Sequence, residues 1–141
     1  MSTANANEVV QVFALTKSAP ATYANPSGAF EPMPGTALEI KLKLPSLLVV
    51  TFCGRGEVTP SGSHIIPFVF IKCEIDGSPC QPNSNPIEFL YPQFCCDSRS
   101  FTWMVPEVKP GTHKVAVMWG MGNPTGAIIT QRTLIVYAAK I

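Results

Sequence analysis

The side chains that could carry acid–base or nucleophilic chemistry are few in this sequence, and they form no known catalytic pattern. His64 and His113 are the only histidines. A serine-hydrolase triad needs a histidine beside a nucleophile and an orienting carboxylate, and no G-x-S-x-G motif marks such a serine. His64 lies in a Gly-Ser-His loop with the composition of a turn, and His113 begins an expected strand, where it would be solvated or capping. A hydrolase is therefore the least favoured function.

Paired acids and metal ligands are equally sparse. Glycoside hydrolysis requires two carboxylates that face one cleft, whereas Glu74 and Asp76 lie beside Lys72 on one face of a strand, which is typical of a solvated face. Asp76 and Asp97 could contribute to a calcium site, but the other oxygen ligands that calcium requires are missing. We therefore expect a protein that is not an enzyme and that holds no metal ion or cofactor.

The five cysteines, an odd number, cannot all pair within one chain. They are Cys53, Cys73, Cys80, Cys95 and Cys96. No Cys-x-x-Cys or His-x-x-x-His spacing indicates a zinc site, and adjacent cysteines rarely bond to each other because the geometry is strained. We interpret the cysteines as small buried hydrophobic residues, with a disulfide from Cys80 to Cys95 or Cys96 left open.

Composition limits the partners of this chain. Its 141 residues are enough for one domain with a hydrophobic core. Hydrophobic residues make up 46%, but charged residues only 13%, about half the usual share of about 25%. A net charge of +1, with scattered Lys and Arg, argues against a nucleic-acid partner. A surface so poor in charge favours a partner that covers part of it, which is the first indication of a homo-oligomer.

The sequence carries no membrane or export signal that we recognise. Its longest strongly apolar run, residues 47–53, is far shorter than the roughly 20 residues of a membrane-spanning helix. The first residues lack the basic and apolar regions of a secretory signal. We expect a cytoplasmic or particle-associated protein without a membrane partner.

Strands, not helices, are expected throughout. Fourteen prolines and ten glycines interrupt the chain, and no window sustains helical periodicity. Residues 36–44 alternate between apolar and polar side chains, and the continuous apolar run 47–53 is typical of a central strand covered on both faces. Turn residues at 76–79 and 109–112 reverse the chain, and residues 123–126 are expected to form a hairpin. The expected strands are residues 9–15, 36–44, 47–53, 65–75, 87–90, 100–105, 113–119 and 127–138.

About eight strands with turns roughly every ten residues indicate an all-β, antiparallel β-sandwich. We favour a jelly-roll-like topology because closing the strands into two packed sheets hides most sheet edges. An immunoglobulin-like sandwich stays open, although the Cys…Trp…Cys order typical of that fold is absent. We expect a flexible N-terminus over residues 1–8 and a single β-sandwich domain over residues 9–141.

Four stretches carry a resemblance: PGTALEIKLKLPSLLVVTFCGRGEV, FIKCEIDGSPCQP, SFTWMVPEVKPGTHKVAVMWG and ITQRTLIVYAA. Together they resemble a group of poorly characterised bacterial and phage-associated domains with a VLVDG strand and turn, a PGTHTV…V.W strand and a closing RTLTV strand. The resemblance spans almost the whole chain and implies a jelly-roll sandwich similar in build to tumour-necrosis-factor-like and phage fibre-tip domains. Many of those are trimers, and the resemblance implies no catalytic activity. The cysteines and Lys114 depart from the pattern.

Three expected strands are apolar on both faces, which is unusual for a sandwich strand that faces water. Burying one Phe side chain is worth roughly 1.5–3 kcal/mol, and aromatic residues and Met are enriched at interface centres. We predict that one sheet has a second apolar face at which copies of the chain associate, most simply as a trimer. The open alternatives are a satellite core beneath the chain's own loops and a ligand groove. The outward pairs are Phe68 and Phe70, Ala116 and Met118, and Ile135 and Tyr137.

The main functional hypothesis is a non-catalytic structural or binding module that self-associates. The alternative is a carbohydrate-binding, lectin-like module that uses the loops at one end, with a glycan as partner. Tyr91, in the proline-flanked loop LYPQF, is the best single contact candidate, and Arg55, His64 and Arg99 lie in or next to candidate loops. Both tryptophans share a face with expected core residues, so we assign them to the core.

Overall fold

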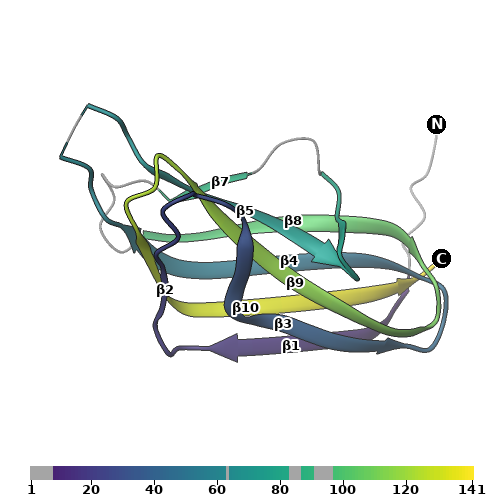
Figure 1. Ribbon diagram of the computed structural model, residues 1–141. Helices are drawn as coiled ribbons and strands as arrows, with labels where there is room; N and C mark the ends of the chain where they lie inside the picture. The colour runs from purple at the N-terminus through teal and green to yellow at the C-terminus, as the bar shows by residue number, and fades with distance from the viewer. Residues whose placement is uncertain (1–7, 63, 83–86, 91–96) are drawn as a thin grey trace, which may run out of the picture.

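The computed structural model describes residues 8–62, 64–82, 87–90 and 97–141. Each expected strand segment is a strand here, so the all-β prediction is confirmed. The expected flexible N-terminus falls, apart from Glu8, outside the described residues. Within them the strands are β1 (Val9–Lys17), β2 (Ala21–Tyr23), β3 (Glu31–Leu42), β4 (Ser46–Val58), β5 (Phe68–Ile75), β6 (Ser78–Pro79), β7 (Ile87–Leu90), β8 (Asp97–Val108), β9 (Gly111–Gly122) and β10 (Ala127–Lys140) (Figure 1).

The strands form two antiparallel sheets packed face to face (Figure 1). The first, which we call the β10 sheet, has the order β1-β10-β4-β8, with β2 also pairing with β10. The second, the β9 sheet, has the order β3-β9-β5-β6, with β7 also pairing with β5. Setting aside the short β2 and β6, the pairs β1–β10, β3–β9, β4–β8 and β5–β7 are nested, first with last and so inward. This nesting is the jelly roll that the sequence favoured.

The turn-forming residues lie between strands, as expected, but one of these turns does not connect two strands of the same sheet. Residues 123–126 were expected to close a hairpin; instead they carry the chain from β9 in one sheet to β10 in the other. The tight hairpin is the one between β5 and β6, where Ile75 pairs with Ser78. Its two turn residues, Asp76 and Gly77, have φ of 50° and 81°, which is the left-handed backbone that a type I′ turn requires at both positions.

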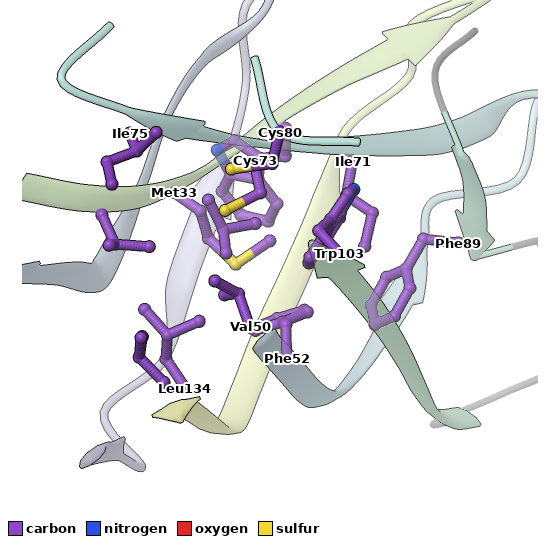
Figure 2. Close-up of a cluster of buried hydrophobic side chains, with 14 of the residues drawn as sticks. Met33, Val50, Phe52, Ile71, Cys73, Ile75, Cys80, Phe89, Trp103 and Leu134 are labelled. Atoms are coloured by element: carbon purple, nitrogen blue, oxygen red, sulfur yellow. The ribbon is translucent and has the colours of Figure 1, made fainter. Parts of the chain in front are cut away.

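The core lies between the two sheets and is made from alternate residues of each strand. Trp103 and Trp119 are both buried there, as expected. In β4 buried residues alternate with half-buried or exposed ones, so the apolar run 47–53 is fully covered on one face only. The prediction that this strand is covered on both faces was therefore wrong. Figure 2 shows Met33, Val50, Phe52, Trp103 and Leu134 converging on the cluster from strands of both sheets.

A buried arginine ties three backbone segments together. A register irregularity in β10 between Ile129 and Arg132 turns Arg132 inward, as bulges commonly re-aim a side chain, and leaves it only 5% exposed. Its guanidinium donates hydrogen bonds to the carbonyl oxygens of Pro34 at 2.8 Å, Ala19 at 2.8 Å and Thr130 at 2.6 Å. Burial lowers the pKa of Arg132, but the carbonyl dipoles replace much of the lost hydration.

We expect the substitution Arg132→Met to lower the free energy of unfolding by about 2–4 kcal/mol, because three part-buried hydrogen bonds to backbone carbonyl groups would be lost. Urea unfolding followed by tryptophan fluorescence measures the change. Lys41→Met is the matched control: Lys41 is exposed on β3, so its replacement should change stability by about 0.5 kcal/mol or less. Equal losses in the two variants would contradict the role assigned to Arg132.

Candidate functional site

The residues predicted to form one interface lie on two different sheets. Phe68, Phe70, Ala116 and Met118 are on β5 and β9 in the β9 sheet, whereas Ile135 and Tyr137 are on β10 in the β10 sheet. All of them point away from the core, as the alternation predicted. The prediction of a single sheet that is apolar on both faces was nevertheless wrong, because β10 pairs with β4 and not with β9. The two outer faces must be considered separately.

On the β9 sheet, the outward phenylalanines cover glycines of the neighbouring strand. Phe68 and Phe70 are half-buried, with ring centroids 6.2 Å apart. A Cβ added at Gly122 would lie 2.8 Å from Cε2 of Phe70, so the ring occupies the space that a side chain would fill. At Gly120 an added Cβ would lie 2.9 Å from the carbonyl oxygen of Gly28 and 3.3 Å from Cγ of Phe30. The Nζ of Lys72 lies 4.7 Å from the centre of the Phe30 ring. Aromatic rings commonly rescue strand glycines like this.

The remainder of this outer face carries charged side chains of both signs beside the apolar ones. In the register of the sheet, Glu39 pairs with Lys114, and Glu74 pairs with Ala116. A hollow of about 300 Å³ lies here, with Ala116 and Met118 in its lining and with Glu74, Asp76 and Lys114 beside them. The outward apolar residues of the β9 sheet are thus partly covered by their own chain and interrupted by charges of both signs.

The outer face of the β10 sheet is different, because neutral side chains from four strands align on it. Val12, Tyr137, Val49 and Met104 form one row straight across β1, β10, β4 and β8. Two parallel rows complete what we call the uncharged face: one of Ala14, Ile135, Thr51 and Thr102, and one of Thr16, Thr133, Cys53 and Ser100. None of these side chains is charged. Val12 is 57% exposed, Met104 45% and Tyr137 37%.

Hydroxyl groups on this face are already paired with one another. The hydroxyl oxygens of Thr51 and Thr102 lie 3.0 Å apart, and those of Thr16 and Thr133 lie 3.4 Å apart. Because each pair satisfies part of its own hydrogen-bonding capacity within the sheet, covering the face with apolar atoms costs less than covering free hydroxyls would. The chemistry of the face therefore suits a dry contact.

Three of the four predicted ligand-contact residues lie within the described part of the chain, and two of them, Arg55 and Arg99, face opposite sides of their sheet. Arg55 is exposed beyond the last row of the uncharged face, in the lining of a hollow of about 190 Å³ that also includes Cys53, Ser98 and Gln131. Arg99 lies on the adjacent strand opposite Gly54, with the parity of the inward-facing Phe101. His64 is exposed between β4 and β5. Tyr91 lies outside the described residues.

A third hollow lies at the loop end of the sandwich. It has a volume of about 330 Å³ and is lined by the segment after β2 and by the link between β9 and β10. Asn25 stabilises the first segment by accepting hydrogen bonds from the backbone N–H and hydroxyl of Ser27. The Thr125 hydroxyl donates to the carbonyl oxygen of Thr59, closing the other side. The hollow thus has a polar rim whose described side chains are partly engaged.

His113 is bound at both ring nitrogens, which the sequence did not predict. Its Nδ1 lies 2.6 Å from Oδ2 of Asp76, and its Nε2 lies 2.8 Å from the carbonyl oxygen of Lys109. The hydrogen bond to Asp76 is the main cause that raises the pKa of His113, and the same bond lowers the pKa of Asp76, with help from the backbone N–H of Lys114. This pair joins the β5–β6 turn to the start of β9.

Within the described residues no group of three His, Cys, Asp or Glu side chains could hold a metal ion. Of the described cysteines, Cys53 is exposed, whereas Cys73 and Cys80 are buried and free. Cys95 and Cys96 lie outside the described residues, so a disulfide between Cys80 and either of them stays a prediction. The same described part of the chain contains no helix long and apolar enough to span a membrane.

No protein-family model matches this chain, and neither does any curated protein sequence. Among solved structures, it is similar to dimeric latent PorU from Porphyromonas gingivalis, with a TM-score of 0.49 and 8% identity over 98% of this chain and 14% of that one. It is also similar to VP2 of infectious bursal disease virus, with a TM-score of 0.49 and 12% identity over 97% of this chain and 38% of that one. A family 35 carbohydrate binding module from Clostridium thermocellum has a TM-score of 0.42 and 8% identity over 86% of this chain and 97% of that module. The chain therefore spans only a minor part of the first two proteins, and at such identities the likeness concerns architecture alone.

The His113–Asp76 pair gives a pH prediction. Because the folded-state pKa of His113 is raised, its contribution to stability is complete below the ordinary pKa of about 6.5 and is lost as the pH rises through the raised value. NMR titration should show the His113 pKa above the ordinary value, and Asp76→Asn should move it downwards. The difference in unfolding free energy between the wild type and Asp76→Asn should shrink over the same rise in pH.

His64, which is exposed and remote in sequence from the substitution, gives a reference signal in these spectra. A His113 titration that does not respond to Asp76→Asn would show that the hydrogen bond in the structure does not form in solution.

Proposed function

We propose that this protein is a non-catalytic jelly-roll module that self-associates by burying the uncharged face of its β10 sheet against a second copy. The observation that carries the proposal is the alignment of neutral side chains in three rows across β1, β10, β4 and β8. In a sandwich strand, apolar residues that face the core usually alternate with polar or charged residues that face water. The outer face of the β9 sheet carries such charges, whereas the three rows on the outer face of the β10 sheet carry none.

The size of the face fits a reversible contact. With strands about 4.8 Å apart and about 3.4 Å per residue, three rows over four strands cover about 400 Å². Thr and Ser hold five of the twelve positions, so the apolar area is smaller than this and lies near the few hundred Å² at which apolar patches mark interaction sites on soluble proteins. A stable complex buries about 800 Å² on each partner, so the residues around the rows must contribute as well. We therefore expect an assembly weaker than an obligate oligomer.

A second copy is the occupant that the chemistry favours. A face without charge cannot form ion pairs with a charged partner. Its threonine hydroxyls are paired with one another, so they have less capacity to bind a sugar than free hydroxyls would. Two identical sheet faces can pack about 10 Å apart, as the two sheets of a sandwich do, and a two-fold axis makes such a contact self-complementary. The trimer implied by the family resemblance stays a prediction. The mass measured by light scattering distinguishes it from a dimer.

We expect Tyr137→Glu to shift the protein towards the monomer, because an unpaired carboxylate would be buried within the contact. The cost of about 2 kcal/mol or more corresponds to a rise in Kd of about 30-fold or more. Light scattering coupled to size exclusion, over a range of protein concentrations, gives the mass and the Kd.

Ala37→Glu is the matched control, because Ala37 is exposed on the outer face of the β9 sheet. It should leave the mass unchanged. A wild-type protein that is monomeric at the highest concentrations would overturn the proposal, and so would an oligomer that Ala37→Glu weakens and Tyr137→Glu does not.

A second candidate function is glycan binding at the loop end. The observation that favours it is the hollow of about 330 Å³ between the segment after β2 and the β9–β10 link, which is lined by exposed Thr side chains and by the half-buried Asn25. A lectin-like module was expected to bind its glycan through loops at one end of the sandwich, and this hollow lies at such an end. Within the described lining, the one tyrosine, Tyr23, is buried and donates its hydroxyl to the carbonyl oxygen of Ala29 at 2.6 Å, so it offers no stacking surface to a sugar.

If the hollow binds a glycan, Ala24→Trp should abolish the binding seen on a glycan array, because Ala24 lines the hollow and a large ring there would fill it. Ser18→Trp is the control, since Ser18 is exposed outside the hollow. Tyr91→Ala tests the other candidate contact in parallel. Binding that is lost only with Tyr91→Ala would move the site away from the hollow, and an array without signal would remove this candidate function.

A further inference from the structure

Two cysteines face each other in the core, and neither the jelly roll nor the proposed function requires them. Cys73 is on β5 and Cys80 follows β6; their side chains are 1% and 2% exposed. The pairs Ile75–Ser78 and Glu74–Pro79 precede them in the same hairpin, so Cys73 and Cys80 are the next residues across the ladder. The backbone N–H of Cys80 donates to the carbonyl oxygen of Cys73 at 2.9 Å.

The geometry is suitable for a covalent link. Residues of a hydrogen-bonded antiparallel pair have Cα atoms about 5.5 Å apart, which is within the separation that disulfides span. The thiol of Cys73 also hydrogen-bonds that of Cys80, so both side chains already point at each other. Figure 2 shows the two labelled cysteines next to one another at the edge of the buried cluster.

Cys80 belongs to a segment that connects the two sheets. The next residue, Gln81, exchanges two backbone hydrogen bonds with Met104 of β8, at 2.9 Å and 2.8 Å. One end of this segment is therefore anchored to the β9 sheet through Cys80, and the other to the β10 sheet through Gln81. A covalent bond at Cys80 would fix the segment that holds the outer edge of β8.

We infer that Cys73 and Cys80 are a cross-strand oxidation site, at which a small-molecule disulfide such as oxidised glutathione introduces an intrachain disulfide. The thiolate of Cys80 attacks one sulfur of the small disulfide and releases one small thiolate. The thiolate of Cys73 then attacks the Cys80 sulfur of the mixed disulfide and releases the second. Two protein thiols are oxidised, one small disulfide is reduced to two thiols, and these take up the two protons.

Access to the buried pair comes from its place in the sheet. β6 has two residues, Ser78 and Pro79, both exposed, and it lies at the end of the sheet order. Edge segments with few ladder bonds open at a lower free-energy cost than central strands do. Opening of this edge exposes Cys80 without unfolding the core, and closing then returns it to Cys73.

The test is oxidation of the full chain with oxidised glutathione, both in the native state and during refolding from urea, followed by alkylation and peptide mapping under non-reducing conditions. We expect the five cysteines to include two that become resistant to alkylation, a peptide that links Cys73 to Cys80, and a rise in the midpoint of thermal unfolding. The rise should disappear on reduction.

Cys53→Ser is the matched control, because Cys53 is exposed and outside the pair; it should leave the linked peptide and the rise in the midpoint intact. Cys73→Ala should abolish both, and Cys80→Ala gives the same answer should Cys73→Ala fold poorly. A linked peptide that joins Cys80 to Cys95 or Cys96 would overturn the inference. So would a Cys73 and Cys80 that both remain alkylatable after refolding in the oxidant.

Discussion

The long antiparallel ladder between β4 and β10 is the constraint on which the rest of the structure depends. It runs from Ser46 opposite Lys140 to Val58 opposite Ala127, with one irregularity. Each strand has a further partner on its other side, β8 and β1 respectively. Because side chains alternate with a period of two, a slip of one residue would turn the core residues outwards. The same register that buries Leu48, Val50 and Phe52 therefore sets the uncharged face on the reverse side of the sheet.

Much of the fold was readable from the sequence, because alternation and turn residues act locally. Every expected strand exists, and only the short β2 and β6, of three and two residues, were missed, since so few residues show no alternation. Which strands share a sheet was not readable, because pairing depends on residues far apart in the chain. For this reason the outward parity of Ile135 and Tyr137 was predicted correctly, yet their grouping with Phe68 and Phe70 was wrong.

The candidate site shows the same division between local and distant information. The sequence indicated side chains that face outwards, but it gave no sign that Phe70 covers Gly122 or that Val12, Tyr137, Val49 and Met104 align in one row. Both depend on the register between separate strands. The run Trp119-Gly120-Met121-Gly122 did contain a usable signal: small residues at outward positions of a strand need cover from a neighbour. That signal would have favoured the satellite-core alternative for the phenylalanines.

The outer faces of the two sheets differ in how their uncharged residues are arranged. The β9 sheet folds its aromatic side chains over its own glycines, whereas the outer face of the β10 sheet carries three rows of neutral side chains. Association of the β10 sheet by strand addition at its edges is hindered. At the β8 edge, Met104 already exchanges both backbone hydrogen bonds with Gln81. Near the β1 edge, the Gln11 amide donates to Lys41 and accepts from Lys43, which ties that strand to the end of β3. An edge occupied at such points pairs poorly with another strand, and for this reason we place the proposed contact between copies on the face and not at the edges.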